Sequence, residues 1–184
     1  MFDARRSKLG MGLIAACVFG ALGASAQLAA VGSGSVGFLA VGPGGLEIKG
    51  QGAQVSAREA NQKLEIEVPL TRLETGIDLR DRHLREYMHV DQHPTAKLVI
   101  DRAALTFPKD QAVGQGSARG DFWLNGKQHP LDFTYQAKRD GADYQVQALA
   151  TVDIRNHDIE VPCYLKLCVE PLVKLKVRFS LREQ

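Results

Sequence analysis

Apolar and charged residues alternate with a period of two along much of this 184-residue chain. Within residues 64–70 the apolar positions are Leu64, Ile66, Val68 and Leu70. Near the C-terminus the same alternation, with lysine and arginine in between, involves Leu175, Val177, Phe179 and Leu181. Successive side chains of a β-strand point to opposite faces, so each stretch predicts a strand with one apolar and one charged face. Such strands have to bury their apolar faces against one another, which favours an antiparallel sheet closed on itself.

The dipeptide Asn125-Gly126 predicts a two-residue hairpin turn, because both residues tolerate positive φ. With Leu124 opposite Lys127, one face holds the pair Phe122–His129 and three pairs of a small residue with a large one, namely Gly120–Leu131, Ala118–Phe133 and Gly116–Tyr135. The other face then holds two favourable cross-strand pairs, Arg119–Asp132 and Ser117–Thr134. This hairpin therefore has a well-defined predicted register.

A second dipeptide, Asp140-Gly141, predicts the next hairpin in the same way. Centring the turn on these two residues gives the pairs Lys138–Asp143, Tyr135–Val146 and Phe133–Ala148. Three consecutive antiparallel strands are thus expected over about residues 115–155. A slip of one residue would exchange the faces of a strand and break these pairs.

The segment 31–52 is rich in glycine, with Gly42-Pro43-Gly44-Gly45 as expected turn material between two short strands. The spacing Gly32-x-Gly34-x-x-Gly37 matches a dinucleotide-binding fingerprint, but a strand rather than a helix is expected after it, so we do not assign a nucleotide site. Only residues 75–90 have apolar residues near helical spacing. About eight strands and one short helix predict an all-β fold, an eight-stranded antiparallel barrel.

The first 26 residues have the features of a secretory signal peptide. Arg5, Arg6 and Lys8 precede an apolar run that ends in Ala24-Ser25-Ala26, the small residues that a peptidase requires. We therefore expect residues 1–26 to be removed, residues 27–184 to form one domain, and the protein to be periplasmic without a stable membrane span. Lipid anchoring at Cys17 is a minor alternative, since Ile14-Ala15-Ala16-Cys17 resembles a lipobox.

The net charge of +2 belongs to that leader. The leader carries three of the 23 basic residues and one of the 21 acidic ones, which leaves 20 of each in the remaining chain. Nucleic-acid binders carry an excess of lysine and arginine. A nucleic-acid partner is therefore disfavoured.

Metal binding and catalysis find little support in the sequence. His83, His89 and His93, with Asp81, are the candidate ligands for a metal, but Pro94 biases His93 away from helical geometry and no further ligand is fixed. The sequence contains no Gly-x-Ser-x-Gly elbow, and the acidic residues of segment 75–90 lie among arginines, as on a solvated helix. We expect no enzyme activity and no cofactor, and a metal protein that uses these histidines is the alternative.

Cys163 and Cys168 are the two cysteines of the expected mature chain. Five residues of extended chain span roughly 16 Å, whereas a disulfide needs a Cα separation below about 7 Å. A disulfide requires the chain between Pro162 and Pro171 to turn back on itself. We favour unpaired cysteines, and the disulfide remains open.

The predicted inner face is apolar and includes small residues, which suits a long apolar ligand. Gly116, Ala118, Gly120 and Ala148 are expected to leave space beside the large side chains. A simply filled core is the competing hypothesis. The candidate ligand-binding residues are Phe38, Ile66, Val68, Phe122, Leu131, Phe133, Tyr135, Tyr144, Val146, Leu175, Val177 and Phe179.

The order of several short motifs over residues 33–182 resembles that of the YceI-like family of exported proteins. The motifs are Leu73-x-Thr75-Gly76-Ile77, Asp81-x-His83-Leu84, Pro94-x-Ala96-x-Leu98, Gly120-x-Phe122-x-Leu124-Asn125-Gly126, His129-Pro130 and His157-x-Ile159-x-x-Pro162-x-Tyr164-Leu165. The resemblance implies a lipocalin-like barrel in the periplasm that binds a polyisoprenoid chain, such as the tail of an isoprenoid quinone, and is no established enzyme. It also suggests residues 76–90 as a lid. Nothing in the sequence predicts an oligomeric state.

Overall fold

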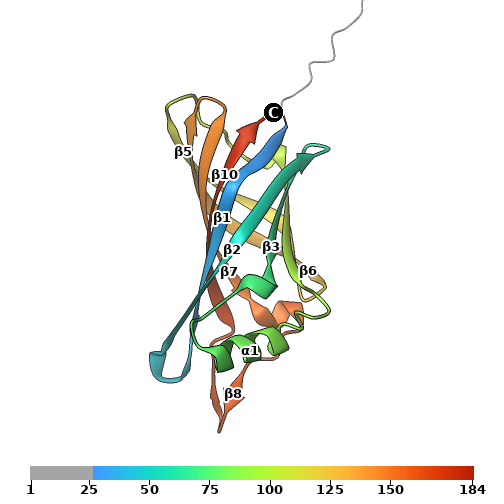
Figure 1. Cartoon of the computed structure of the whole chain (residues 1–184), viewed down its shortest axis with the longest axis vertical. Helices are drawn as coiled ribbons and strands as arrows, with labels where there is room; N and C mark the ends of the chain where they lie inside the picture. The colour runs from blue at the N-terminus through green and yellow to red at the C-terminus, as the bar shows by residue number, and fades with distance from the viewer. Residues whose placement is uncertain (1–26) are drawn as a thin grey trace, which may run out of the picture.

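Eight long strands close into an antiparallel barrel in the computed structural model, which describes residues 27–184 apart from the side chain of Tyr164 (Figure 1). The expected signal peptide and Cys17 lie outside the described residues. The strands are β1 (Leu28–Val41), β2 (Glu47–Ala60), β3 (Lys63–Pro69), β4 (Thr95–Asp101), β5 (Val113–Leu124), β6 (Lys127–Asp140), β7 (Asp143–Asp153) and β10 (Leu172–Glu183). Their order around the barrel is β1-β10-β7-β6-β5-β4-β3-β2. The predicted eight-stranded barrel is confirmed.

The shorter elements gather mainly at one end of the barrel. The single α-helix within residues 27–184, α1 (Asp78–Tyr87), lies there with the small hairpin of β8 (Cys163–Tyr164) and β9 (Leu167–Cys168) and the connection between β1 and β2 (Figure 1). Four short 3₁₀ helices complete the described elements: η1 (Pro43–Gly45), η2 (Leu70–Arg72), η3 (Arg102–Ala104) and η4 (Ile154–His157). We call this end, formed by residues 42–46, α1 and the β8–β9 hairpin, the mouth end.

The hairpin of β5 and β6 has the predicted register, from Leu124 opposite Lys127 to Gly116 opposite Tyr135. The predicted register of β6 with β7 is wrong by two residues, because Tyr135 lies opposite Ala148 and Asp140 opposite Asp143. The turn consists of Gly141 and Ala142, and only Gly141, its first central residue, has positive φ, as in a type II′ turn. A shift of two residues keeps every side chain on its predicted face.

The glycine-rich N-terminal strands are longer than predicted, with 14 residues each in β1 and β2. Glycine is needed in β2 because neighbours lie very close to its backbone. A Cβ atom at Gly50 would lie 2.3 Å from the ring of Phe38, and one at Gly52 would lie 2.8 Å from a methyl carbon of Leu73. These glycines let the chain after β3 pack against β2, where Gln51 and Glu74 form an isolated bridge.

The barrel end opposite the mouth, the closed end, is covered by the chain between β4 and β5. Phe107 from this chain packs edge-to-face on Tyr144, whose exposed fraction is 1%. Nearby, the buried carboxylate of Glu59 accepts a hydrogen bond from the backbone N–H of Leu28 and pairs with Arg102. The carboxylate of Glu59 in β2 thereby joins the start of β1 to the connection that follows β4.

Cys163 and Cys168 form a disulfide, with Cα atoms 4.0 Å apart, so the expectation of unpaired cysteines is wrong. The distance argument assumed an extended chain. Leu165 and Lys166 instead have φ values of 47° and 66°, and this tight turn places the two cysteines directly opposite each other in β8 and β9.

Candidate ligand-binding cavity

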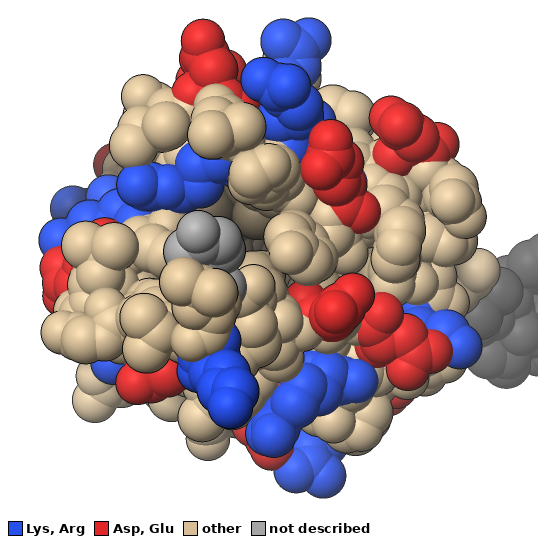
Figure 2. Space-filling view, turned by 90° about the horizontal axis from the view of Figure 1, so that it is seen from below, with Lys and Arg blue, Asp and Glu red and all other residues tan. Residues whose placement is uncertain are grey.

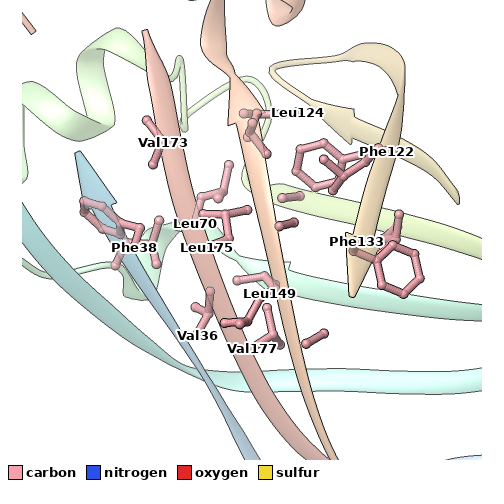
Figure 3. Close-up of a pocket in the computed structure, with 18 of the residues that line it drawn as sticks. Val36, Phe38, Leu70, Phe122, Leu124, Phe133, Leu149, Val173, Leu175 and Val177 are labelled. Carbon is pink, nitrogen blue, oxygen red and sulfur yellow. The ribbon is translucent and has the colours of Figure 1, made fainter. Parts of the chain in front are cut away.

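The barrel encloses a cavity of about 640 Å³ whose wall receives side chains from all eight long strands. This volume lies within the range of about 300–1,000 Å³ that is usual for ligand sites. Aliphatic and aromatic groups cover the wall, and Figure 3 shows those of Val36, Leu175 and Phe122 pointing into the space from β1, β10 and β5. The alternation that predicted the strands thus produces a continuous apolar interior.

All twelve residues predicted from the sequence lie in the wall of this cavity: Phe38, Ile66, Val68, Phe122, Leu131, Phe133, Tyr135, Tyr144, Val146, Leu175, Val177 and Phe179. Their contact with a ligand stays a prediction. The prediction omitted β4, which contributes Ala96, Leu98 and Ile100 with the same period of two. It also omitted Leu84 and Met88 of the helical segment, and Leu105 and Phe107 from the closed end.

The small residues on β5 do not supply the space of the cavity, contrary to expectation. A Cβ atom at Gly116 would lie 2.8 Å from the hydroxyl oxygen of Tyr135, so this ring already covers the glycine. A Cβ atom at Gly120 would lie 2.7 Å from the carbonyl oxygen of Val99 on the neighbouring strand. Of the four small residues proposed, Ala148 alone lines the cavity.

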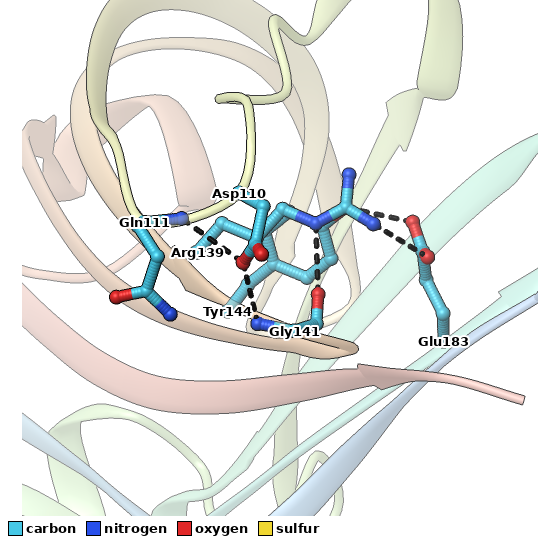
Figure 4. Close-up of polar contacts among 6 residues, drawn as sticks. All are labelled: Asp110, Gln111, Arg139, Gly141, Tyr144 and Glu183. Carbon is cyan, nitrogen blue, oxygen red and sulfur yellow. Dashed lines mark hydrogen bonds and ion pairs between the residues drawn. The ribbon is translucent and has the colours of Figure 1, made fainter.

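Polar atoms at the closed end of the cavity are engaged with the protein. The hydroxyl oxygen of Tyr135 accepts a hydrogen bond of 2.6 Å from the backbone N–H of Thr106. The hydroxyl of Tyr144 donates to Glu183 at 2.7 Å, and burial, together with this bond, raises the pKa of Tyr144 to about 12. Arg139 pairs with the same carboxylate, as Figure 4 shows. This end of the cavity is therefore closed by groups that already have partners.

The mouth end combines apolar walls with a few polar side chains. Thr75, Arg80 and His83, all from the segment of α1, line the cavity there, beside Pro162 and Leu167. Seen from below, Figure 2 shows a hollow among uncharged residues, with acidic and basic side chains distributed around it. Among the described residues, Arg80 is the one lysine or arginine in the wall, and a ligand that entered here would meet it at the entrance.

The candidate metal ligands are not assembled into a site. His89 Nδ1 lies 3.1 Å from the side-chain oxygen of Asn125, while the ring of His93 packs against Gly126 and His83 faces the cavity. Within residues 27–184 no group of three or more His, Cys, Asp or Glu side chains is placed to hold a metal ion. The fold thus gives the histidine hypothesis no geometric support.

Residues 34–181 match the family model of the YceI-like domain. The chain belongs to this family. Solved structures with the same fold include a polyisoprenoid-binding domain from Saccharophagus degradans implicated in plant cell wall breakdown, with 14% identity, a TM-score of 0.70, and coverage of 87% of this chain and 99% of that one. BcnA of Burkholderia cenocepacia has 9% identity and a TM-score of 0.61 over 80% of this chain and 95% of its own. The Campylobacter jejuni YceI protein has 12% identity and a TM-score of 0.52, and the match covers 74% of this chain and 85% of that one.

No curated protein matches the sequence significantly. Among the described residues of this YceI-like barrel, no helix is long and apolar enough to cross a membrane.

Several of the quoted family motifs have structural roles around the mouth of this YceI-like barrel. Asn125 donates a hydrogen bond of 3.0 Å from its side-chain nitrogen to the carbonyl of His157. His157, which the site prediction did not include, is buried against Phe122, and burial lowers its pKa. The motif histidine is therefore a packing residue between the β5–β6 turn and the barrel wall.

Asp81 fixes α1 across the mouth. Its carboxylate accepts hydrogen bonds from the backbone N–H of Thr75 at 2.6 Å and from the Thr75 hydroxyl at 2.5 Å. These bonds lower the pKa of Asp81, and they hold the helix to the chain that follows β3. The proposed lid segment is thus tied down at its first turn.

We expect Asp81→Asn to increase amide hydrogen exchange of residues 77–88 several-fold at pH 7, because the amide oxygen accepts these bonds less strongly than a carboxylate. A carboxylate with a lowered folded-state pKa stabilises the fold above its unfolded pKa of about 4, and this contribution is lost as the pH falls through the lower folded pKa. The variant should therefore lose part of the acid dependence of exchange below about pH 4. Asp78→Asn, on the exposed face of the same helical turn, is the matched control, and equal effects of both substitutions would contradict the anchoring role.

Proposed function

We propose that this YceI-like barrel binds the apolar chain of an isoprenoid-type lipid in its cavity, as a carrier or store. The observation that supports this most strongly is the continuous apolar wall, which is built from eight strands and has its polar groups at the two ends. Binding would come from removal of apolar surface from water, worth roughly 25 cal/mol per Å². Such a site selects a long hydrocarbon chain and offers few directional contacts in its middle.

The arrangement of the polar groups favours one orientation of such a ligand. Tyr135 and Tyr144 at the closed end already have protein partners, whereas Arg80 and His83 lie at the mouth. A polar head group would keep its hydration or meet Arg80 if it stayed at the mouth. We therefore propose that the chain enters first and that the head group remains beside α1.

The finer assignments belong to the same proposal. The cationic and apolar N-terminal pattern supports export and a periplasmic location. The similar fold of a polyisoprenoid-binding domain supports an isoprenoid ligand. The polar side chains of the cavity wall are few and lie at opposite ends, which supports a binding protein rather than an enzyme. An isoprenoid quinone is one ligand of this class.

Native mass spectrometry of the protein purified from the periplasm tests the proposal. We expect a bound species whose mass matches a prenyl compound, and organic extraction should recover it. An empty barrel that also fails to bind an added long-chain prenyl alcohol would contradict the carrier function. Metal analysis of the same sample addresses the alternative, since stoichiometric zinc that is lost on His89→Ala and His93→Ala would favour a metal protein.

A further inference from the structure

Exposed apolar side chains concentrate at the mouth end of the barrel. Nine large hydrophobic residues of the described chain are exposed, and six of them lie at this end: Leu46, Ile77, Leu79, Leu165, Leu167 and Leu172. Leu165, at the tip of the β8–β9 hairpin, has an exposed fraction of 79%. The other three, Val31, Val113 and Leu149, are scattered along β1, β5 and β7. Such a concentration at one end is typical of a surface that contacts an apolar partner.

The chain holds these residues in place on separate projections. Figure 1 shows the β1–β2 connection, α1 and the β8–β9 hairpin extending from the same end of the barrel. The hairpin is closed by the Cys163–Cys168 disulfide, and the backbone N–H of Glu170 donates to the carbonyl of Val41 at 2.7 Å, which joins it to the rim. Leu165 therefore stays exposed on a braced turn instead of folding back onto the barrel.

The exposed residues continue the apolar lining of the cavity to the outside. Leu167 belongs to both sets, because it lines the cavity and is more than half exposed. On α1, Leu84 faces the cavity and Leu79 faces solvent. A long apolar molecule could thus pass between the cavity and an apolar medium at the mouth with little contact with water.

The charges at this end do not select a charged partner. Acidic and basic groups alternate along α1, as Asp78, Arg80, Asp81 and Arg82 show, and Figure 2 shows both signs around the hollow. Separate apolar tips surrounded by charges fit a lipid bilayer, in which the tips reach the acyl chains and the charges stay among the head groups. A stable protein interface would need a continuous surface of about 800 Å² on each partner.

We propose that the mouth end docks on the surface of a lipid bilayer, with Leu165 and its apolar neighbours inserted and the cavity facing the membrane. The passage of a prenyl ligand through this contact rests on the proposed function, but the docking itself does not. Because the leucines and not the charges would make the contact, docking should occur on uncharged lipid and change little with salt.

Flotation with phosphatidylcholine vesicles tests the docking with the exported protein. We expect the affinity of the double variant Leu79→Ser, Leu165→Ser for these vesicles to be reduced by about tenfold or more, because the two leucine side chains are no longer there to be buried in the lipid. Val113→Ser is the matched control, because Val113 is 58% exposed but lies at the start of β5, away from the mouth. Val113→Ser should bind as the unsubstituted protein does. For each protein, binding should change little when the salt is raised from 0.1 to 0.5 M, so the loss in the double variant should persist.

Three results would overturn the docking surface: no vesicle binding by the unsubstituted protein, equal losses in Val113→Ser, or binding only to anionic vesicles at low salt. Self-association that the leucine substitutions abolish, without vesicle binding, would assign the surface to a second copy of the chain. Binding of a soluble prenyl alcohol without vesicles should be unchanged in the double variant. If the protein floats with vesicles but binds no prenyl alcohol, the proposed function is contradicted and the docking stands. If it binds prenyl alcohol but does not float with vesicles, the docking is contradicted and the proposed function stands.

Discussion

Glu59→Ala is expected to lower the free energy of unfolding by about 3–5 kcal/mol, the usual effect of removing one partner from a buried ion pair. The side chain of Glu59 is 2% exposed, and its carboxylate serves both the guanidinium of Arg102 and the backbone N–H of Leu28. Its removal leaves a buried N–H group without an acceptor and the guanidinium without its carboxylate. Urea denaturation followed by far-ultraviolet circular dichroism measures the change.

An exposed ion pair of the same barrel provides the control. Asp132 pairs with Arg119 through two hydrogen bonds of 2.6 and 2.7 Å, but both side chains are about two-thirds exposed or more. Asp132→Ala should therefore cost at most about 1 kcal/mol despite this good geometry. Similar losses for the two variants would show that the buried pair does not hold the closed end together.

Ala148→Phe is expected to weaken binding of a long-chain prenyl ligand by about 100-fold or more. Ala148 lines the cavity on β7, opposite Tyr135 on one side and Val177 on the other. A phenyl group there would take the place of the ligand, and a 100-fold loss corresponds to only about 110 Å² of lost apolar contact at 25 cal/mol per Å². Fluorescence titration with a prenyl probe measures the affinity.

Thr151→Phe, on the same strand, adds the same group to the outer surface of the barrel, where Thr151 is exposed. It should leave the affinity unchanged, and both variants should keep a cooperative unfolding transition. Retained binding in a folded Ala148→Phe protein would mean that the ligand does not use this part of the cavity. Ala148 borders the cavity but also packs against the cluster of Ile100, Phe133 and Tyr135, so the unfolding transition has to be measured together with the affinity.

The alternation of apolar and charged residues was enough to predict the barrel and the side chains that face its interior. A period of two specifies two faces, and it does so independently of the exact strand ends. This is why all twelve predicted residues line the cavity even though the register of β6 with β7 differs by two. The turn residues Asn125-Gly126 carried enough conformational preference to set one register correctly, whereas Asp140-Gly141 allowed two positions for the turn.

The way side chains fill that interior could not be predicted from this alternation. The ring of Tyr135 occupies the space expected beside Gly116, and the neighbouring strand occupies the space beside Gly120. Such packing depends on atoms that are distant in sequence. The disulfide depends on the tight turn between the two cysteines. The burial of Glu59 depends on its contact with Arg102, 43 residues further along the chain. Local preferences thus set the faces of the strands, and the closure of the barrel set the shape of the cavity and of its mouth.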